Sequence, residues 1–172
     1  MKRKFSLFIT AAASLGAALV AAGYGGSATA GSGYPPSYGS YGSVQRAAAT
    51  RATIGVAKSR LGRILVDGRG RALYLFEKDK RIASTCYGAC AGVWPPLTTA
   101  GKPHAVRGAL AARLGTTRRS DGKLEVTYNG HPLYRYVGDT QPGDTKGQGL
   151  NQFGGGWDVL SPKGTKIEGG GS

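Results

Sequence analysis

The sequence predicts an all-β fold built from two pseudo-repeats. Residues 74–79 and 134–139 both read Tyr-x-aromatic-x-x-Asp, and the two copies start 60 positions apart (134 − 74 = 60). Without a gap, the same shift aligns Gly62 with Gly122, Ile64 with Leu124, Val66 with Val126, Gly70 with Gly130 and Leu73 with Leu133. Both copies combine β-branched and aromatic runs with Gly-containing turns, which is typical of strands. We therefore expect an internal duplication in which each repeat is a hairpin plus a Trp-containing closing strand, packed as a small sandwich or closed meander.

Residues 1–30 have the layout of a secretory signal peptide. A basic cluster at residues 2–4 precedes an uncharged apolar stretch at residues 5–22, and Ala28-Thr29-Ala30 provides a small-x-small cleavage site. The alternative is a retained membrane anchor, since about 18 apolar residues are at the lower limit for spanning a bilayer. The many alanines and the nearby small-residue site favour cleavage near residue 30.

Residues 31–52 are rich in Gly, Ser, Tyr, Pro and Ala and predict a disordered linker. Such a segment cannot bury enough apolar surface to offset its ordering entropy. A ligand motif is the alternative to a plain spacer. The duplicated β domain is expected over residues 53–168, with repeat one at about 53–100 and repeat two at about 114–162. Residues 169–172 form a Gly-rich tail.

Each repeat contains a predicted β-hairpin. In repeat one, residues 64–67 and 72–76 flank a Gly-containing turn, which indicates a bulged or three-residue loop. In repeat two, apolar and polar residues alternate over residues 124–128, and Asn129-Gly130 follows. An Asn-Gly pair supplies the two positive φ angles of a type I′ turn, so a tight hairpin is expected there.

The aromatic residues of the repeat motif are expected to pack in the interior, because two residues apart on a strand they share one face. A solvent-facing ligand platform is the alternative. A tryptophan ends each repeat, and we expect each to fill the core of its own half. The Asp that ends each motif is expected to accept backbone N–H groups in an Asx-turn, with cation binding as the alternative. The residues given a structural role are Tyr74, Phe76, Asp79, Tyr134, Tyr136, Asp139, Trp94 and Trp157.

Residues 102–119, between the repeats, are basic and partly rich in Ala and Leu. Val106, Leu110, Ala111 and Leu114 fit one helical face. A short helix is therefore expected in this connection.

Cys86 and Cys90 are the only cysteines of the chain. In an exported protein such a pair predicts a disulfide, and a helical turn would hold residues four apart within bridging distance. A redox pair or a metal site is the alternative, but redox pairs normally have two intervening residues rather than three. His104 and His131 do not have the spacing of a zinc site. We expect no metal and no cofactor, and the absence of a catalytic motif predicts that the protein is not an enzyme.

The chain is strongly basic, with 23 Lys and Arg against 9 acidic residues. Loss of the three basic residues of the signal peptide would leave 20 against 9, a net charge of about +11. Such a charge favours anionic envelope polymers and lipid headgroups as partners, with no specific nucleic acid. The alternative is a basic surface without a specific partner. The candidate contacts are Lys78, Lys80, Arg81, Arg107, Arg113, Arg118 and Arg119.

Several motifs in order resemble the bacterial family called "secreted repeat of unknown function", which is also described as predicted lipoproteins. They are Gly-Arg-Ile-Leu-Val-Asp at 62–67, Cys-x-x-x-Cys-Ala-x-x-Trp-Pro-Pro-Leu at 86–97, Tyr-Asn-Gly-x-Pro-Leu-Tyr-x-Tyr-x-x-Asp at 128–139, Gly-Gly-Trp at 155–157, and the repeat motif itself. The resemblance covers about residues 53–162 and implies export and a repeated β unit, but no reaction. Tyr24 stands where a lipobox would have its lipidated Cys, so we expect a periplasmic or secreted protein without a lipid anchor.

Together these observations predict an exported, non-catalytic envelope or extracellular protein that binds polyanionic surface material through its basic residues. The alternative function is redox or metal handling at Cys86 and Cys90 in the envelope. The oligomeric state does not follow from the sequence.

Overall fold

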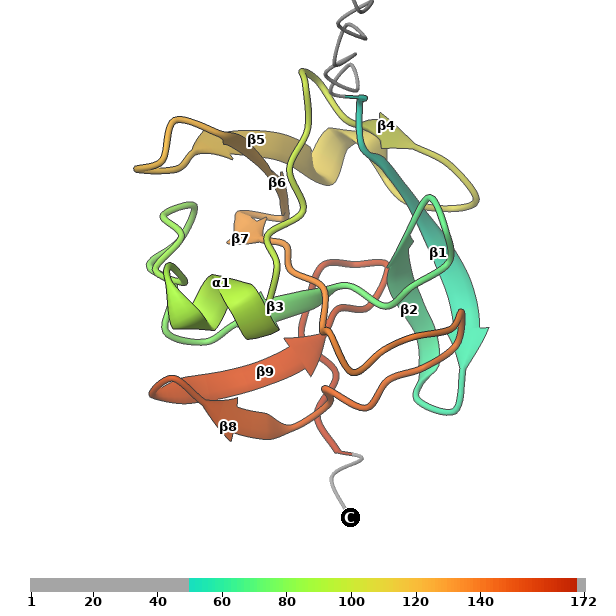
Figure 1. Cartoon of the computed structure of the whole chain (residues 1–172). Coiled ribbons are helices and arrows are strands. Elements are labelled where there is room, and N and C mark those ends of the chain that lie inside the picture. The colour runs from blue at the N-terminus through green and yellow to red at the C-terminus, as the bar shows by residue number, and fades with distance from the viewer. Residues whose placement is uncertain (1–49, 170–172) are drawn as a thin grey trace, which may run out of the picture. The chain divides into compact units, whose positions relative to one another are not determined.

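The computed structural model describes residues 50–169, and it consists mainly of strands (Figure 1). The predicted signal peptide, most of the predicted linker and the last three residues lie outside the described part. The strands are β1 (Thr53–Ser59), β2 (Gly62–Asp67), β3 (Tyr74–Phe76), β4 (His104–Ala105), β5 (Leu114–Arg118), β6 (Leu124–Tyr128), β7 (His131–Pro132), β8 (Leu150–Gln152) and β9 (Gly155–Val159). The helical elements are α1 (Ala89–Val93) and a 3-10 turn (Ala111–Arg113). The all-β prediction is confirmed.

The described strands form three small sheets, in the orders β2-β1-β4, β3-β9-β8 and β5-β6-β7. The sheets do not close into a barrel. Each repeat opens with an antiparallel hairpin, β1–β2 in the first and β5–β6 in the second. Two hairpins of the same kind at the start of both repeats give the domain its internal symmetry.

The tight turn predicted at Asn129-Gly130 is present. Asn129 has φ 52° and Gly130 has φ 84°, and Tyr128 pairs with His131 across the turn. Both φ angles are positive, as a type I′ turn requires. In repeat one, the corresponding chain reversal is wider, because the Asp67 N–H donates to the Arg71 carbonyl and Val66 pairs with Ala72.

The closing segment of each repeat pairs with the motif strand of the other repeat. Strand β3 of repeat one pairs with β9 of repeat two, with Phe76 opposite Trp157. Reciprocally, Tyr134 of repeat two forms a β-bridge with Pro96 of repeat one. At the centre, Tyr74 and Tyr134 exchange backbone hydrogen bonds of 2.9 and 3.0 Å. The two repeats therefore interlock rather than pack as separate units.

Four aromatic rings from both repeats stack along the centre of the domain. Trp94 and Trp157 stack at 4.0 Å between ring centroids, and Tyr136 and Phe76 extend the stack at its two ends, at 4.5 and 4.0 Å. Both tryptophans are fully buried. The expectation that each tryptophan fills its own half is wrong, because the exchange of closing segments brings both rings to the shared interface. Such aromatic pairs contribute about 0.5–1.5 kcal/mol each beyond their buried area.

The helix expected between the repeats is absent, and this prediction is wrong. The connection contains the two-residue strand β4 and a single 3-10 turn before β5. Arg107 and Gly108 have φ angles of 48° and 86°, which interrupt a right-handed helix at that point. Leu110, expected on the buried face of the helix, is 47% exposed.

Candidate anion-binding site

The tyrosine and aspartate of the repeat motif meet their partners across the two repeats. The Tyr74 hydroxyl donates to Asp139 Oδ2 at 2.5 Å, and the Tyr134 hydroxyl donates to Asp79 Oδ2 at 2.7 Å. Burial raises the pKa of both tyrosines above their usual value, and the neighbouring carboxylates add to this effect. Burial also raises the pKa of both aspartates, against the opposing effect of these hydrogen bonds. The motif therefore ties the repeats together.

The other oxygen of each motif carboxylate holds the loop that follows it. Asp79 Oδ1 accepts from the Thr85 N–H at 2.7 Å, and Asp139 Oδ1 accepts from the Lys146 N–H at 2.9 Å. These acceptors lie six and seven residues before their donors, so the contacts are loop anchors and not the expected Asx-turns. Among residues 50–169, no group of three His, Cys, Asp or Glu side chains is placed to hold a metal ion.

Cys86 and Cys90 form the expected disulfide at the start of α1, with their Cα atoms 5.2 Å apart. Cys86 is fully buried and Cys90 is 7% exposed. A thiol that exchanges with a partner needs access to its sulfur. The burial of this pair is what a structural bridge requires.

Arg119 is not a surface cation, so its prediction as a polyanion contact is wrong. Its side chain is 1% exposed and pairs with the fully buried Glu125 at 2.7 Å. The same guanidinium donates to the Cys86 carbonyl at 2.7 Å and to Ser84 Oγ at 2.6 Å. These contacts lock Arg119 into the packing between repeat two and the disulfide loop of repeat one.

The remaining candidate cations are spread over separate elements. Lys78, Lys80 and Arg81 belong to the loop after β3, where all three are exposed. Arg107 and Arg118 are also exposed, whereas Arg113 is half-buried and donates to Asn129 Oδ1 at 2.6 Å. None of these residues lines the three hollows described below. The structure does not bring them together into one site.

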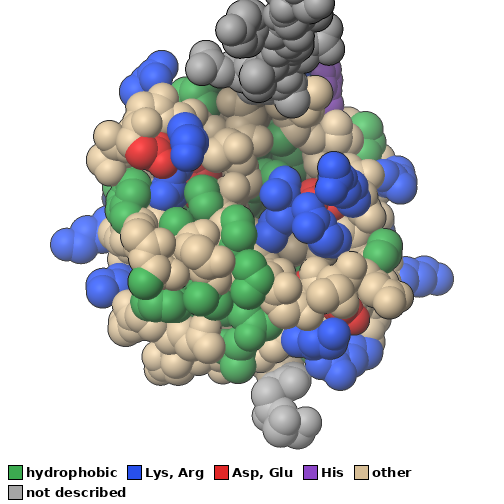
Figure 2. Space-filling view, in the orientation of Figure 1, with side chains coloured by type: hydrophobic (Ala, Val, Ile, Leu, Met, Phe, Trp, Pro, Cys, Tyr) green, Lys and Arg blue, Asp and Glu red, His purple; other side chains and the backbone are tan. Residues whose placement is uncertain are grey.

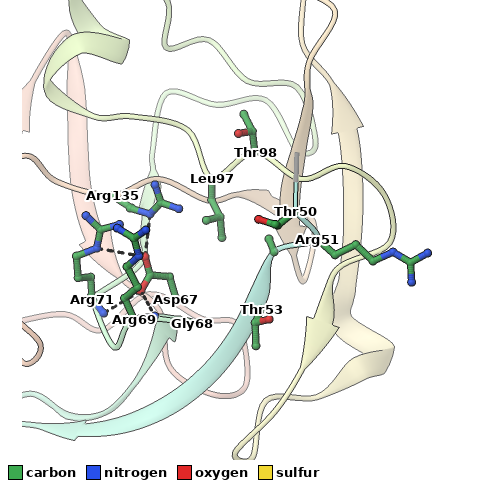
Figure 3. A pocket seen from close by; sticks show the side chains of 11 residues that line it. Thr50, Arg51, Thr53, Asp67, Gly68, Arg69, Arg71, Leu97, Thr98 and Arg135 are labelled. Atoms are coloured by element: carbon green, nitrogen blue, oxygen red, sulfur yellow. Dashed lines mark hydrogen bonds and ion pairs between the residues drawn. The ribbon is translucent and has the colours of Figure 1, made fainter. Parts of the chain in front are cut away.

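A group of arginines lies at a corner that the sequence analysis did not single out. The turn after β2 and the segment after β7 converge there on a cavity of about 280 Å³ (Figure 3). Its lining comprises Thr50, Arg51, Ala52, Thr53, Asp67, Gly68, Arg69, Arg71, Leu97, Thr98 and Arg135. Figure 3 shows Arg69, Arg71 and Arg135 gathered around Asp67, whereas Arg51 points away from this group.

The buried carboxylate of Asp67 organises this corner. Its Oδ1 accepts the backbone N–H groups of Arg69 and Arg71 at 2.9 and 3.1 Å. Its Oδ2 lies 3.1 Å from Arg71 Nη2 and 2.9 Å from Arg135 Nε. Burial alone would raise the pKa of Asp67, but these N–H groups and arginine charges bring it below its usual value. Asp67 is therefore an anion that holds two guanidinium groups in place.

Three guanidinium groups face one carboxylate, so the corner carries an excess of two positive charges. The Arg69 guanidinium takes part in none of the hydrogen bonds or ion pairs found among residues 50–169. Figure 2 shows the resulting cluster of Lys and Arg side chains around a small acidic surface. Arginine presents several donors in a planar fork, which suits carboxylate and phosphate groups. The site can therefore hold an anion.

A second hollow of about 550 Å³ adjoins the first. It shares Thr50, Thr98 and Arg135 with the first cavity and adds Thr99, Lys123 and Leu124. Arg69 and Arg71 line only the first hollow, and Lys123 lines only the second. We call the two adjoining hollows together the arginine groove.

The equivalent corner of the other half does not carry these charges. The 60-residue shift places Thr127 at the position of Asp67, Asn129 at that of Arg69, His131 at that of Arg71, and Leu75 at that of Arg135. Leu75, Asn129 and His131 line a pocket of about 450 Å³. The one cation of its lining is Lys166, which pairs with Glu77 at 2.7 Å, and burial lowers the pKa of His131. Comparing the two repeats position by position shows that these charges are present in one copy only, but not that residues 67–71 and residue 135 lie together.

The fold and the site define a duplicated β module with exchanged closing strands and one arginine groove. The family model described as "secreted repeat of unknown function" matches residues 55–98 and 115–161, more than half of the chain, and the chain belongs to this family. The expected membership is thereby confirmed, and the protein is an exported one. No curated protein and no solved structure shows a significant match. Within the described domain, no helix has the length and apolarity needed to cross a bilayer.

Proposed function

We propose that this exported protein is a non-catalytic module that binds anionic material of the cell envelope or its surroundings in the arginine groove. The observation that carries the proposal is the convergence of Arg69, Arg71 and Arg135 on a cavity that contains a single carboxylate, Asp67. A polyanion supplies the negative charges that the corner lacks.

The proposed binding combines a protein that attracts anions through its net charge with one site at which an anion can be held. A net charge of +14 for the whole chain draws anions toward the protein but selects no position on it. The groove selects a position, because Arg71 and Arg135 are held by Asp67 and Arg69 has no protein partner among the described residues. Arginine side chains that are already oriented lose less conformational entropy when an anion binds.

The test compares two double variants that remove the same charge. Arg69→Gln with Arg135→Gln removes two cations from the groove, and Arg71 and two backbone N–H groups still satisfy Asp67. Lys58→Gln with Arg60→Gln removes two exposed cations at the other end of the first hairpin. Retention of each protein on immobilised polyphosphate is measured at low and raised salt.

We expect the groove variant to lose at least about tenfold in affinity and the control to lose less than about twofold. The loss should be largest at low salt. Equal losses in the two variants would show that only net charge matters, and they would overturn the proposed site.

We also propose that the protein acts without a lipid anchor, in the periplasm or outside the cell. This rests on Tyr24, because a thioether-linked lipid needs a cysteine at that position. Intact-mass analysis of the exported protein should give an unacylated chain. A mass that includes acyl groups would contradict the proposal.

A further inference from the structure

We infer that the ligand of the arginine groove is amphiphilic, an anionic phospholipid whose phosphate binds the arginines and whose apolar part packs on a neighbouring strip of the surface. The strip consists of Val93, Pro95 and Val137. The inference rests on the proposed function and narrows it to one class of anion.

Strand geometry places the strip beside the groove. The Arg135 N–H donates to the Pro95 carbonyl at 2.9 Å, and the Val137 N–H donates to the Val93 carbonyl at 3.1 Å. Side chains alternate between the two faces of such a pair. Trp94 and Tyr136 stack in the core, so Pro95, Arg135 and Val137 share the outer face, while Val93, at the end of α1, lies beside Val137 and packs partly against the core.

This outer face is apolar apart from Arg135. Val137 is 53% exposed, and Val93 and Pro95 are half-buried. Figure 2 shows hydrophobic side chains gathered on the surface next to the Lys and Arg cluster. Arg135 belongs both to this face and to the lining of the groove, so the apolar strip and the cationic site are continuous.

The fold itself does not require an apolar strip at this place. The equivalent face in the other half belongs to β3 and β9, with Glu77 at the position of Val137 and the buried Asp158 at that of Pro95. There Glu77 is exposed and pairs with Lys166 at 2.7 Å. The fold therefore tolerates an exposed acidic side chain at the position of Val137, and the valine there needs another reason.

A hydrophilic polyanion would use only the arginines. A phospholipid uses both features, because peripheral membrane binding combines attraction to anionic headgroups with burial of apolar side chains. The combination of an excess of two positive charges and an adjoining exposed valine matches this ligand chemistry.

The experiment measures co-sedimentation of the mature protein with vesicles of phosphatidylglycerol and of phosphatidylcholine, together with its retention on polyphosphate. The test variant is Val137→Ser. The control is Leu110→Ser, an aliphatic residue of similar exposure, 47%, in the connection before β5. We expect preferential binding to phosphatidylglycerol, and we expect Val137→Ser to weaken it about fivefold while polyphosphate retention stays within about twofold.

The two proposals fail in different ways. If the wild-type protein binds polyphosphate through the groove but Val137→Ser leaves vesicle binding unchanged, or if vesicles are not bound, the ligand is a hydrophilic polyanion and this inference is overturned. If Arg69→Gln with Arg135→Gln leaves both kinds of binding intact, the groove itself is not the site. A loss of vesicle binding in Leu110→Ser equal to that in Val137→Ser also overturns the inference.

Discussion

The two halves of the domain share the tyrosines, aspartates and tryptophans of the repeat and differ at their outer corners. In the interior, Tyr74 and Tyr134 each bond the aspartate of the other repeat, and Trp94 and Trp157 stack face to face. At the equivalent outer corners, one half carries three arginines around Asp67, whereas the other has no cation in those positions. The matched motif positions thus serve the fold, and the corner positions that differ are available for binding.

The loops after the two motifs also differ in the way they are held. In repeat one, a disulfide closes residues 86–90. In repeat two, the buried side chain of Gln148 holds the corresponding loop, because it donates to Asp158 and to the Ile167 carbonyl and accepts from the Val159 N–H. Two different chemistries therefore stabilise the same architecture.

Because the two tryptophans stack on each other in the same core, we expect them to contribute equally to the free energy of unfolding. We expect Trp94→Ala and Trp157→Ala each to lower the free energy of unfolding by about 3–5 kcal/mol, since each leaves a large cavity in the central stack. Urea denaturation of the two variants measures this. Phe153→Ala, at an aromatic position that is 41% exposed, should cost less than about 1 kcal/mol. A large difference between the two tryptophans would contradict the shared core.

The buried ion pair of repeat two has no counterpart in repeat one, where Leu65 stands at the position of Glu125. Arg119→Met should cost about 3 kcal/mol at pH 8, because it leaves the Glu125 carboxylate buried without its cation. The double variant Arg119→Met with Glu125→Leu should unfold within about 1 kcal/mol of the wild type. If the double variant is as unstable as the single one, the pair is not what stabilises this region.

The same pair predicts a dependence of stability on pH. Burial raises the pKa of Glu125 to about 7, against the opposing hydrogen bond and charge of Arg119. Because the folded pKa lies above the ordinary glutamate value of 4.5, the folded protein binds the extra proton, and stability decreases as the pH rises from about 4.5 through 7. The defect of Arg119→Met should therefore shrink at pH 5. Urea denaturation at pH 5 and pH 8 checks this, and a defect that is unchanged between them would exclude Glu125 as its cause.

The two tyrosine–aspartate hydrogen bonds between the repeats should also contribute equally to the free energy of unfolding. Tyr74→Phe and Tyr134→Phe should each cost about 2 kcal/mol, since each removes a hydrogen bond to a carboxylate of the other repeat. Thermal and urea unfolding measure the loss. Tyr136→Phe is the matched control, because the Tyr136 hydroxyl has no hydrogen-bond partner among the described residues. If Tyr136→Phe lowers stability as much as Tyr74→Phe and Tyr134→Phe do, the loss is not caused by the hydrogen bonds to the aspartates.

The contrast between the corners can be removed by giving one half the residues of the other. The variant with Asp67→Thr, Arg69→Asn, Arg71→His and Arg135→Leu should lose about tenfold in polyphosphate affinity, about 1.4 kcal/mol, while it stays folded. Lys80→Gln with Arg81→Gln removes the same net charge from an exposed loop and should change affinity less than about twofold. Polyphosphate retention and circular dichroism are the measurements. Full binding by the fourfold variant would contradict the groove.

The elements that could be predicted from the sequence were those with local signals. Asn129-Gly130 forms the expected turn, Cys86 and Cys90 are bridged, and β2, β3 and β6 form within the segments expected to be strands. The exchange of closing strands could not be predicted, because the two repeats have the same motifs and pairing within or between them satisfies the same pattern. The burial of Arg119 next to the exposed Arg118 depends on strand alternation and on a partner from the other repeat.

The candidate site was missed for a related reason. Charge was assessed along the chain, where Arg69 and Arg71 are two cations in a turn and Arg135 is a single one far away. Only the folded chain brings residues 71 and 135 to the same carboxylate, at 3.1 and 2.9 Å. Long-range contacts of this kind do not leave a local signal in one sequence.

The exchange of closing strands has a consequence for the order in which the chain can fold. Tyr74 pairs with Val159, 85 positions later (159 − 74 = 85), so the first repeat cannot complete its sheet until almost the whole domain is available. High contact order of this kind slows folding, because a long loop must close before the pairing is gained. The pairing of β3 with β9 can therefore form only once the C-terminal part of the chain is present.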